Sequence, residues 1–105
     1  MCLFCKIVAG EIPAAKVYED EDVLAFKDIR PIAPVHFLLI PKRHIDSLLT
    51  ATPQDQAILG KLLALAPIVA REQGLGEGFK TSINTGAAGG QEVFHLHLHV
   101  HGTPR

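Results

Sequence analysis

Residues 93–101 read Val-Phe-His-Leu-His-Leu-His-Val-His, so that four histidines alternate with apolar residues in one short stretch. Successive side chains of a β-strand point to opposite faces of a sheet. We therefore predict a last strand over residues 93–100. Its apolar side chains would face the core: Phe94, Leu96, Leu98 and Val100. Its histidines would project from the other face, roughly 6.5–7 Å apart: His95, His97, His99 and His101.

The rest of the chain predicts about four more strands, one long helix and a short N-terminal helix. The long helix begins at Thr52, a good N-cap followed by Pro53 at the first helical position, and ends before Gly74. Because the strands form mostly adjacent hairpins, the sequence favours an α+β fold, with the helix on an antiparallel five-stranded sheet. We expect one domain, residues 1–105. The short helix spans residues 3–9, and the other strands span residues 16–19, 23–27, 36–40 and 79–85.

The composition is that of a globular protein, with 48% hydrophobic and 20% charged residues. Ten basic and 11 acidic residues leave a net charge of −1, which excludes non-specific binding to nucleic acid or to a membrane surface. The longest apolar run, residues 62–70, is too short to span a bilayer, and the N-terminus lacks the features of a signal peptide. We expect a soluble, cytoplasmic protein.

Cys2 and Cys5 form a Cys-x-x-Cys motif at the N-terminus. A structural disulfide is disfavoured in a reducing compartment. A redox-active Cys-x-x-Cys normally follows a strand in a βαβ unit, and none precedes this one. Metal ligation and simple burial remain as interpretations.

The histidine row has four interpretations: a polar face that happens to be rich in histidine, a purification tag, a metal site, or a catalytic site with an imidazole nucleophile. Strict alternation with Leu and Val argues against a tag, and a row of like side chains contributes nothing to stability. The nearby Gly86–Gly90 turn (GAAGG) can bring backbone amides to a phosphate. It lacks the Gly-Lys-Ser/Thr ending of a P-loop, which excludes ATPase chemistry of that kind.

These motifs together resemble the histidine triad (HIT) superfamily, and within it the Hint branch of nucleotide-binding phosphoramidate hydrolases. The resemblance covers nearly the whole chain, including CLFCKI at residues 2–7, APVHFLLIP at 33–41 and GGQEVFHLHLHV at 89–100. It implies hydrolysis of purine nucleoside phosphoramidates or acyl adenylates through a covalent nucleotidyl-histidine. A nucleoside monophosphate is then released, and no organic cofactor takes part.

The resemblance also implies the catalytic roles. His97 is similar to the nucleophile that attacks the α-phosphorus, and His99 to the residue that hydrogen-bonds the phosphate or the leaving group. His36 and His95 resemble the histidines that orient this pair. A neutral imidazole is a competent nucleophile near pH 7, which agrees with these roles.

The nucleotide-binding residues are implied in the same way. Asp28 matches the carboxylate that binds the ribose hydroxyls. Ile29 and Phe26 match the walls of the purine pocket, to which the resemblance adds Val17 and Tyr18. The contacts on the phosphate side, besides His97 and His99, are Asn84, Gly90, Gln91 and Glu92.

Three positions depart from the family pattern and bear on leaving-group preference. Glu92 stands where animal Hint proteins usually have Ser, and His101 occupies the last apolar position of the histidine motif. The chain stops at Arg105, where many relatives continue with a longer tail.

Bacterial relatives imply a structural zinc site. Its four ligands would be Cys2, Cys5, His95, and His44 of the segment PKRH at residues 41–44. Two thiolates and two imidazoles suit tetrahedral zinc. Relatives with the same cysteines also occur without metal. As a ligand, His95 would not also carry protons.

Two alternative functions remain open: hydrolysis of dinucleoside polyphosphates, as in the Fhit branch, and a regulatory scaffold that binds AMP with little turnover. The Cys-x-x-Cys start and the Gly-Gly-Gln-Glu segment favour the Hint branch. Apart from purine nucleotides such as AMP, the expected partner is a second copy of the chain, with no nucleic acid and no membrane.

The expected homodimer would form a ten-stranded sheet through the long helix and an edge strand. One row of the helix, Ile58, Leu62, Leu65 and Val69, would face the sheet. A second apolar row would lie beside it: Leu59, Leu63, Ala66 and Ala70. The alternative is one wide core-facing stripe on a monomer.

Overall fold

The computed structural model describes residues 2–105. Five strands form one antiparallel sheet in the order β1-β2-β3-β5-β4. Together with a long helix and a short N-terminal helix, this sheet confirms the predicted α+β fold. In chain order the elements are α1 (Leu3–Val8), β1 (Lys16–Glu19), β2 (Val23–Lys27), β3 (Val35–Pro41), the 3₁₀ turn η1 (Pro53–Asp55), α2 (Gln56–Glu72), β4 (Lys80–Ser82), the 3₁₀ turn η2 (Ala87–Gly89) and β5 (Leu98–Gly102).

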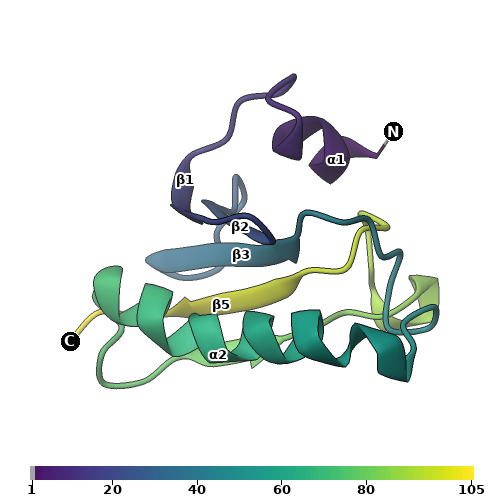
Figure 1. Cartoon of the computed structure of the whole chain (residues 1–105). Helices are drawn as coiled ribbons and strands as arrows, with labels where there is room; N and C mark the ends of the chain where they lie inside the picture. The colour runs from purple at the N-terminus through teal and green to yellow at the C-terminus, as the bar shows by residue number, and fades with distance from the viewer. Residues whose placement is uncertain (1) are drawn as a thin grey trace.

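The two helices lie on opposite faces of the sheet (Figure 1). Side chains of β3 alternate accordingly: Phe37 and Leu39 pack in the cluster under α2, whereas Leu38 and Ile40 pack in the cluster with α1. This alternation follows from the two-residue period of a strand. The sheet therefore has an apolar core on both faces.

The start of the long helix is built as its sequence predicts. Thr52 and Asp55 form a reciprocal capping box, and Pro53 occupies the first turn, which is η1. The helix α2 continues through Pro67 and ends at Glu72. Gly74 follows with φ of +91°, a conformation that favours glycine.

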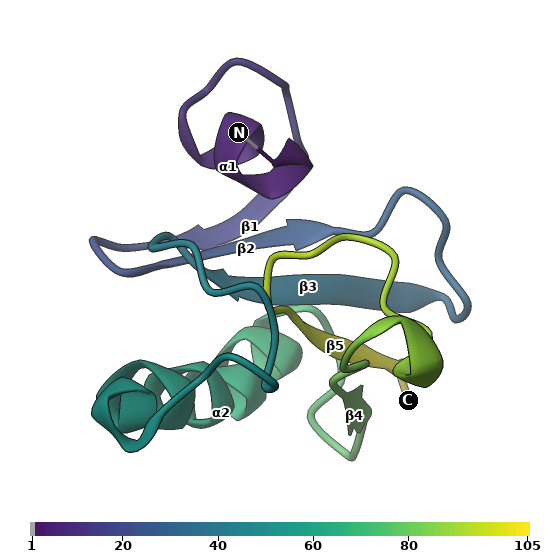
Figure 2. The same cartoon turned by 90° about the vertical axis from the view of Figure 1, so that its right-hand side faces the viewer.

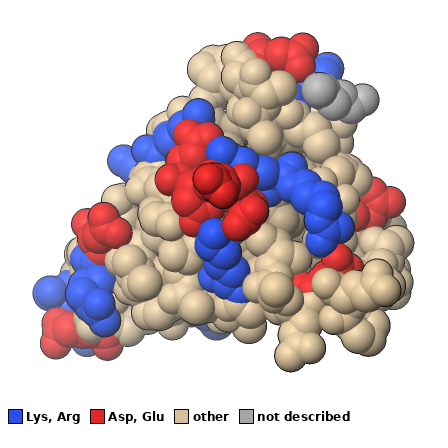
Figure 3. Space-filling model, viewed as in Figure 1, with Lys and Arg blue, Asp and Glu red and all other residues tan. Residues whose placement is uncertain are grey.

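Ion pairs tie α2 to the turn between β1 and β2. The Lys61 ammonium lies 3.0 Å from the carboxylates of both Asp20 and Asp22. On the face shown in Figure 3, acidic and basic side chains are intermixed, and neither sign forms a separate block. No helix within residues 2–105 is long and apolar enough to cross a bilayer.

The last two strands are shorter than predicted. β5 begins at Leu98 rather than residue 93, and β4 covers only Lys80–Ser82 of the expected 79–85. The segment before β5 lies outside the sheet, and there the Leu96 N–H donates to the carbonyl of Ile45, a loop residue, at 2.6 Å. It arches over β3 in Figure 2.

The predicted alternation nevertheless continues through this arch. Leu96, Leu98 and Val100 are buried in the α2-side cluster. The expectation for Phe94 is wrong, since its side chain is 45% exposed. On α2, Leu62 and Val69 are buried in the core as predicted.

Candidate functional site

An open cleft of about 1120 Å³ lies on the α1 side of the sheet. Helix α1 contributes Leu3, Phe4 and Ile7 to its wall. The predicted nucleotide-binding residues line this cleft except for Gln91, Val17 and Tyr18, and so does the predicted supporting residue His36. The predicted residues in the lining are Phe26, Asp28, Ile29, His36, Asn84, Gly90, Glu92, His97 and His99.

The hydrogen bonds of His97 determine which of its nitrogens can react. Its Nδ1 lies 2.7 Å from the carbonyl oxygen of His95, so Nδ1–H must donate to that oxygen. The neutral ring then carries a lone pair on Nε2. The edge of the ring also packs against Phe4, with ring centroids 5.2 Å apart. The hydrogen bond thus fixes the tautomer of the neutral His97 ring, in which Nε2 is the acceptor nitrogen.

A second chain of hydrogen bonds fixes His36 and His99. The Ile32 N–H donates to Nδ1 of His36 at 3.2 Å, which places the proton of the neutral His36 ring on Nε2. That proton is donated to Nδ1 of His99, 3.0 Å away. His99 therefore carries its own proton on Nε2, where it can serve as a donor to a bound anion.

The pKa values of these rings favour the neutral forms. Burial, together with the neighbouring imidazoles of His97 and His36, lowers the pKa of His99 to about 4. Burial also lowers the pKa of His36, although the nearby Asp28 carboxylate partly opposes this effect. Near pH 7 His36 and His99 are therefore hydrogen-bond donors of fixed direction.

Asp28 lies where β2 ends, beside this histidine pair. Its Oδ2 is 3.4 Å from Nε2 of His36, and its Oδ1 accepts the Arg30 N–H at 2.8 Å. Ile29 next to it is 91% exposed at the cleft. A carboxylate beside an exposed apolar side chain suits a sugar with an attached base.

The apolar wall of the cleft differs from the prediction at two positions. Val17 and Tyr18 pack against the α2-side cluster, on the other face of the sheet, so their expected place in the purine pocket is wrong. Several residues that the sequence reasoning missed also line the cleft, among them Phe4, Ile7, Ile12 and Leu38. The apolar face of the short helix was the signal for Phe4 and Ile7.

The glycine-rich turn has backbone conformations that favour glycine. Gly86 and Gly90 have φ of +71° and +81°, and a Cβ on Gly86 would lie 3.0 Å from Cδ1 of Leu49. Asn84 and Gly90 lie together, with the amide of Asn84 3.5 Å from the Gly90 carbonyl. Both reach the cleft beside the histidines.

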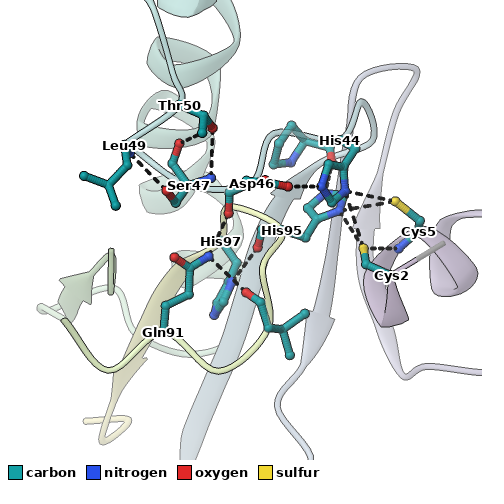
Figure 4. Close-up of polar contacts among 12 residues, drawn as sticks. Cys2, Cys5, His44, Asp46, Ser47, Leu49, Thr50, Gln91, His95 and His97 are labelled. Carbon is teal, nitrogen blue, oxygen red and sulfur yellow. Dashed lines mark hydrogen bonds and ion pairs between the residues drawn. The ribbon is translucent and has the colours of Figure 1, made fainter. Parts of the chain in front are cut away.

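The Gln91 side chain supports this turn, and Figure 4 shows it beside Asp46. Its Oε1 accepts the Gly86 N–H at 2.8 Å, and its Nε2 donates to the carbonyls of Asp46 and Val93 at 2.7 and 3.0 Å. The side chain is buried. We predicted that Gln91 contacts the phosphate directly. In the structure its side-chain amide is bonded to the protein backbone instead, so Gln91 positions the turn.

We expect Gln91→Leu to lower the free energy of unfolding by about 2–4 kcal/mol, because buried backbone groups lose their partners. Urea unfolding of the variant and the wild type measures this loss. Gln54→Leu is the matched control, since Gln54 is exposed, and a change within about 0.5 kcal/mol is expected there. Equal effects of the two substitutions would contradict the role of Gln91.

A second cluster joins the N-terminal helix to the histidine arch (Figure 4). It contains all four predicted metal ligands: Cys2, Cys5, His44 and His95. One donor atom from each lies within 4.8 Å of all the others. The four sulfur-to-Nδ1 separations are 3.3–3.6 Å. Tetrahedral zinc with ordinary Zn–S and Zn–N bonds requires about 3.6 Å, so the donor set fits zinc.

The imidazoles of the cluster are oriented for ligation. Nε2 of His95 donates to the Pro41 carbonyl at 2.7 Å, and Nε2 of His44 contacts the Asp46 carboxylate. In both rings Nδ1 is left for a metal. Burial opposes ionisation of Cys2, but hydrogen bonds from the Cys5 amide and from the side chains of Cys5 and His44 keep the pKa of its thiol below its ordinary value. Such a thiol ionises readily and can ligate.

Residues 9–105 match the HIT domain family. The chain belongs to this family. Among HIT proteins it is 60% identical to protein HitA of Neisseria gonorrhoeae over 103 residues, which are 98% of this chain and 96% of HitA.

Two solved HIT structures resemble the fold closely. The HIT family hydrolase of Legionella pneumophila is 48% identical, with a TM-score of 0.94 over 97% of this chain and 92% of that protein. A zinc-bound histidine triad family protein of Mycobacterium smegmatis is 43% identical, with a TM-score of 0.83 over 99% of this chain and 75% of that protein.

Proposed function

We propose that this HIT protein hydrolyses purine nucleoside phosphoramidates and acyl adenylates, releasing a nucleoside monophosphate such as AMP. The observation that carries the proposal is the lone pair on Nε2 of His97, fixed by the bond from Nδ1–H to the His95 carbonyl. It lies in a cleft that also contains the protonated Nε2 of His99. Similarity to the Legionella pneumophila hydrolase supports hydrolytic chemistry.

The reaction proceeds in two displacements at phosphorus. Nε2 of His97 forms a bond to the α-phosphorus, and the bond from phosphorus to the leaving nitrogen or oxygen breaks, with its electron pair going to the leaving atom. A leaving amine takes a proton from solvent in the open cleft. Water then attacks phosphorus, the bond to Nε2 breaks with its electron pair returning to the ring, and a proton returns to solvent.

The remaining cleft residues bind the nucleotide and stabilise charge. Asp28 accepts hydrogen bonds from the ribose hydroxyls, and Phe26 and Ile29 contact the purine. Nε2–H of His99 donates to the phosphate or to the leaving atom, where charge develops. Asn84, Gly90 and Glu92 lie on the phosphate side.

The decisive experiment measures kcat/KM of the purified protein for adenosine 5′-phosphoramidate, an acyl adenylate and diadenosine polyphosphates. The proposal expects the first two to be the better substrates. A preference for the polyphosphates would favour the alternative activity. Tight AMP binding without turnover of any compound would favour the regulatory scaffold.

We propose zinc as the ion bound by Cys2, Cys5, His44 and His95. The support is the fit of the donor separations to tetrahedral zinc and the similarity to the zinc-bound protein of Mycobacterium smegmatis. Zinc here would be structural, because it would connect α1 to the arch that contains His97. His95 would act as a ligand and would not transfer protons.

We also propose that two copies pair through α2 and the edge strand β4. All three residues of β4 are exposed, and Leu63 on α2 is 57% exposed. Unpaired edges and exposed apolar side chains favour association. Of the predicted second row, Ala66 and Ala70 belong instead to the core of the single chain.

Light scattering at micromolar concentration is expected to give twice the mass of one chain. Leu63→Asp should shift the protein toward the monomer, since it introduces a charge into the proposed interface. Leu49→Asp is the control, because Leu49 is also exposed but lies outside α2 and β4. A wild-type monomer would contradict the dimer.

A further inference from the structure

Asp46 lies between the candidate metal cluster and the glycine-rich turn, and it contacts both. Its carboxylate contacts Nε2 of His44, while Nδ1 of the same ring faces the two thiols of the cluster. Its backbone carbonyl accepts the Nε2–H of Gln91 at 2.7 Å (Figure 4). The Oε1 of Gln91 in turn accepts the Gly86 N–H at 2.8 Å. A continuous series of contacts therefore connects a metal ligand to the turn.

The chain around Asp46 is also bonded to the segment before β5 at a second point. Ile45, the residue before Asp46, accepts the Leu96 N–H at 2.6 Å. Leu96 separates the ligand His95 from His97, the proposed nucleophile, and Nδ1–H of His97 donates to the His95 carbonyl. Whatever holds the two histidine ligands in place therefore also holds the backbone on which the cleft depends.

The Asp46 carboxylate has little to contribute to folding by itself. Its side chain is 55% exposed, and that of His44 is 39% exposed. Exposed ion pairs of this kind contribute little to stability. An acceptor on the far nitrogen of a metal-bound imidazole, in contrast, fixes the orientation of the ring, and its loss typically lowers metal affinity about 10–100-fold. The carboxylate is therefore placed to act on the metal ligand.

The contacts of Asp46 lead to one end of the cleft. Gly90 and Glu92, which flank Gln91 in the chain, line the cleft on the proposed phosphate side. Phe26 and Asp28, assigned to the base and the ribose, belong instead to β2 and its end. A change at Asp46 should therefore alter the binding of a phosphate more than the binding of a nucleoside.

We infer that Asp46 is a positioning residue that couples occupancy of the metal cluster to phosphate binding in the cleft. With the His44 ring fixed as a ligand, the Asp46 carboxylate has a fixed donor, and its carbonyl stays directed at Gln91. The turn then keeps the conformation in which Gly90 reaches the phosphate. This inference rests on the proposed function and adds to it a control of nucleotide affinity by a divalent metal ion.

The first experiment measures the Kd of AMP and of adenosine by calorimetric titration of zinc-loaded and chelated wild type, well below both melting temperatures. Chelation should weaken AMP binding about fivefold or more, the usual size of coupling between two sites. Adenosine binding should stay nearly unchanged, whereas a merely structural role of the metal would weaken both ligands alike. Because coupling is reciprocal, AMP should raise the affinity for zinc by the same factor.

Variants at residue 46 assign the coupling. Asp46→Ala should bind zinc about 10–100-fold more weakly. At saturating zinc it should bind AMP more weakly than wild type does, with adenosine binding unchanged. Asp46→Asn keeps an acceptor oxygen and should retain most of the AMP affinity. Glu21→Ala is the matched control, because it removes an exposed carboxylate from the turn between β1 and β2 and should change neither affinity.

The possible results separate the inference from the proposed function. Equal losses of AMP and adenosine binding on chelation, or no loss of either, would overturn the inference while AMP is still bound. Wild-type AMP affinity in zinc-loaded Asp46→Ala would overturn the role of Asp46, and protein that takes up no zinc would overturn the coupling. Wild type that binds AMP no better than adenosine would contradict the phosphate side of the proposed function, and the inference with it.

Discussion

Replacing His97 with alanine is expected to lower phosphoramidate turnover by about 10⁴-fold or more, as removal of an enzymatic nucleophile usually does. AMP binding should persist, since the proposed function assigns it to Asp28, the apolar wall and the glycine-rich turn. Rapid-quench kinetics and calorimetric titration with AMP measure the two effects. Mass spectrometry of the quenched wild type should show a nucleotidyl adduct on His97.

Two further observations make this result specific. Added imidazole should restore part of the activity of His97→Ala, because it can occupy the space left by the side chain and attack phosphorus itself. His97→Ala should also keep a cooperative thermal melt, which excludes general unfolding as the cause. An adduct found on His95 or His99 would instead assign the nucleophile elsewhere.

Removing zinc is expected to produce the second large effect. The protein should contain about one zinc per chain, and chelation should lower its melting temperature by about 10 °C or more. Ligand binding at 100 times Kd contributes about 2.7 kcal/mol, and 1 kcal/mol shifts a domain of this size by about 4–8 °C. Metal analysis and calorimetry, before and after chelation, measure both quantities.

Matched variants locate the metal. Cys5→Ser should lose the zinc and melt at the temperature of the chelated wild type, with no further shift on chelation. His101→Leu removes a histidine outside the cluster and should retain about one zinc per chain. Protein without zinc after growth in zinc-supplemented medium, with both thiols reactive, would contradict the site.

The histidine arch, the segment that precedes β5, is where prediction and structure differ most. Strict alternation correctly placed Leu96 on one side and His95 and His97 on the other, yet the strand starts only at Leu98. Alternation depends on extended backbone alone, whereas a strand also needs a neighbour to pair with. At Leu96 that partner is the loop residue Ile45, whose position no local pattern reveals.

The Gln91 side chain shows, for the candidate site, that a local sequence pattern does not reveal contacts with distant residues. The sequence placed it in the phosphate-binding segment, and the structure confirms that its neighbours Gly90 and Glu92 line the cleft. Its own amide points instead to Gly86, Asp46 and Val93. Asp46 is 45 residues away in the chain, so only the folded chain brings the two together.

Periodicity and capping, which act over a few residues, determined the helix from Thr52, the strands over residues 16–19 and 23–27, and the face to which the histidines point. The donor types of Cys2, Cys5, His44 and His95 determined which metal chemistry was available. Only the tertiary structure decided which nitrogen of each imidazole is free. The carbonyl of His95 accepts a hydrogen bond from Nδ1–H of His97, which leaves Nε2 of the neutral ring unprotonated. The Ile32 N–H instead donates to Nδ1 of His36, which places the proton of that neutral ring on Nε2. Each tautomer is set by a backbone group whose direction depends on the folded chain. The tautomers therefore cannot be predicted from the sequence of the histidine row alone.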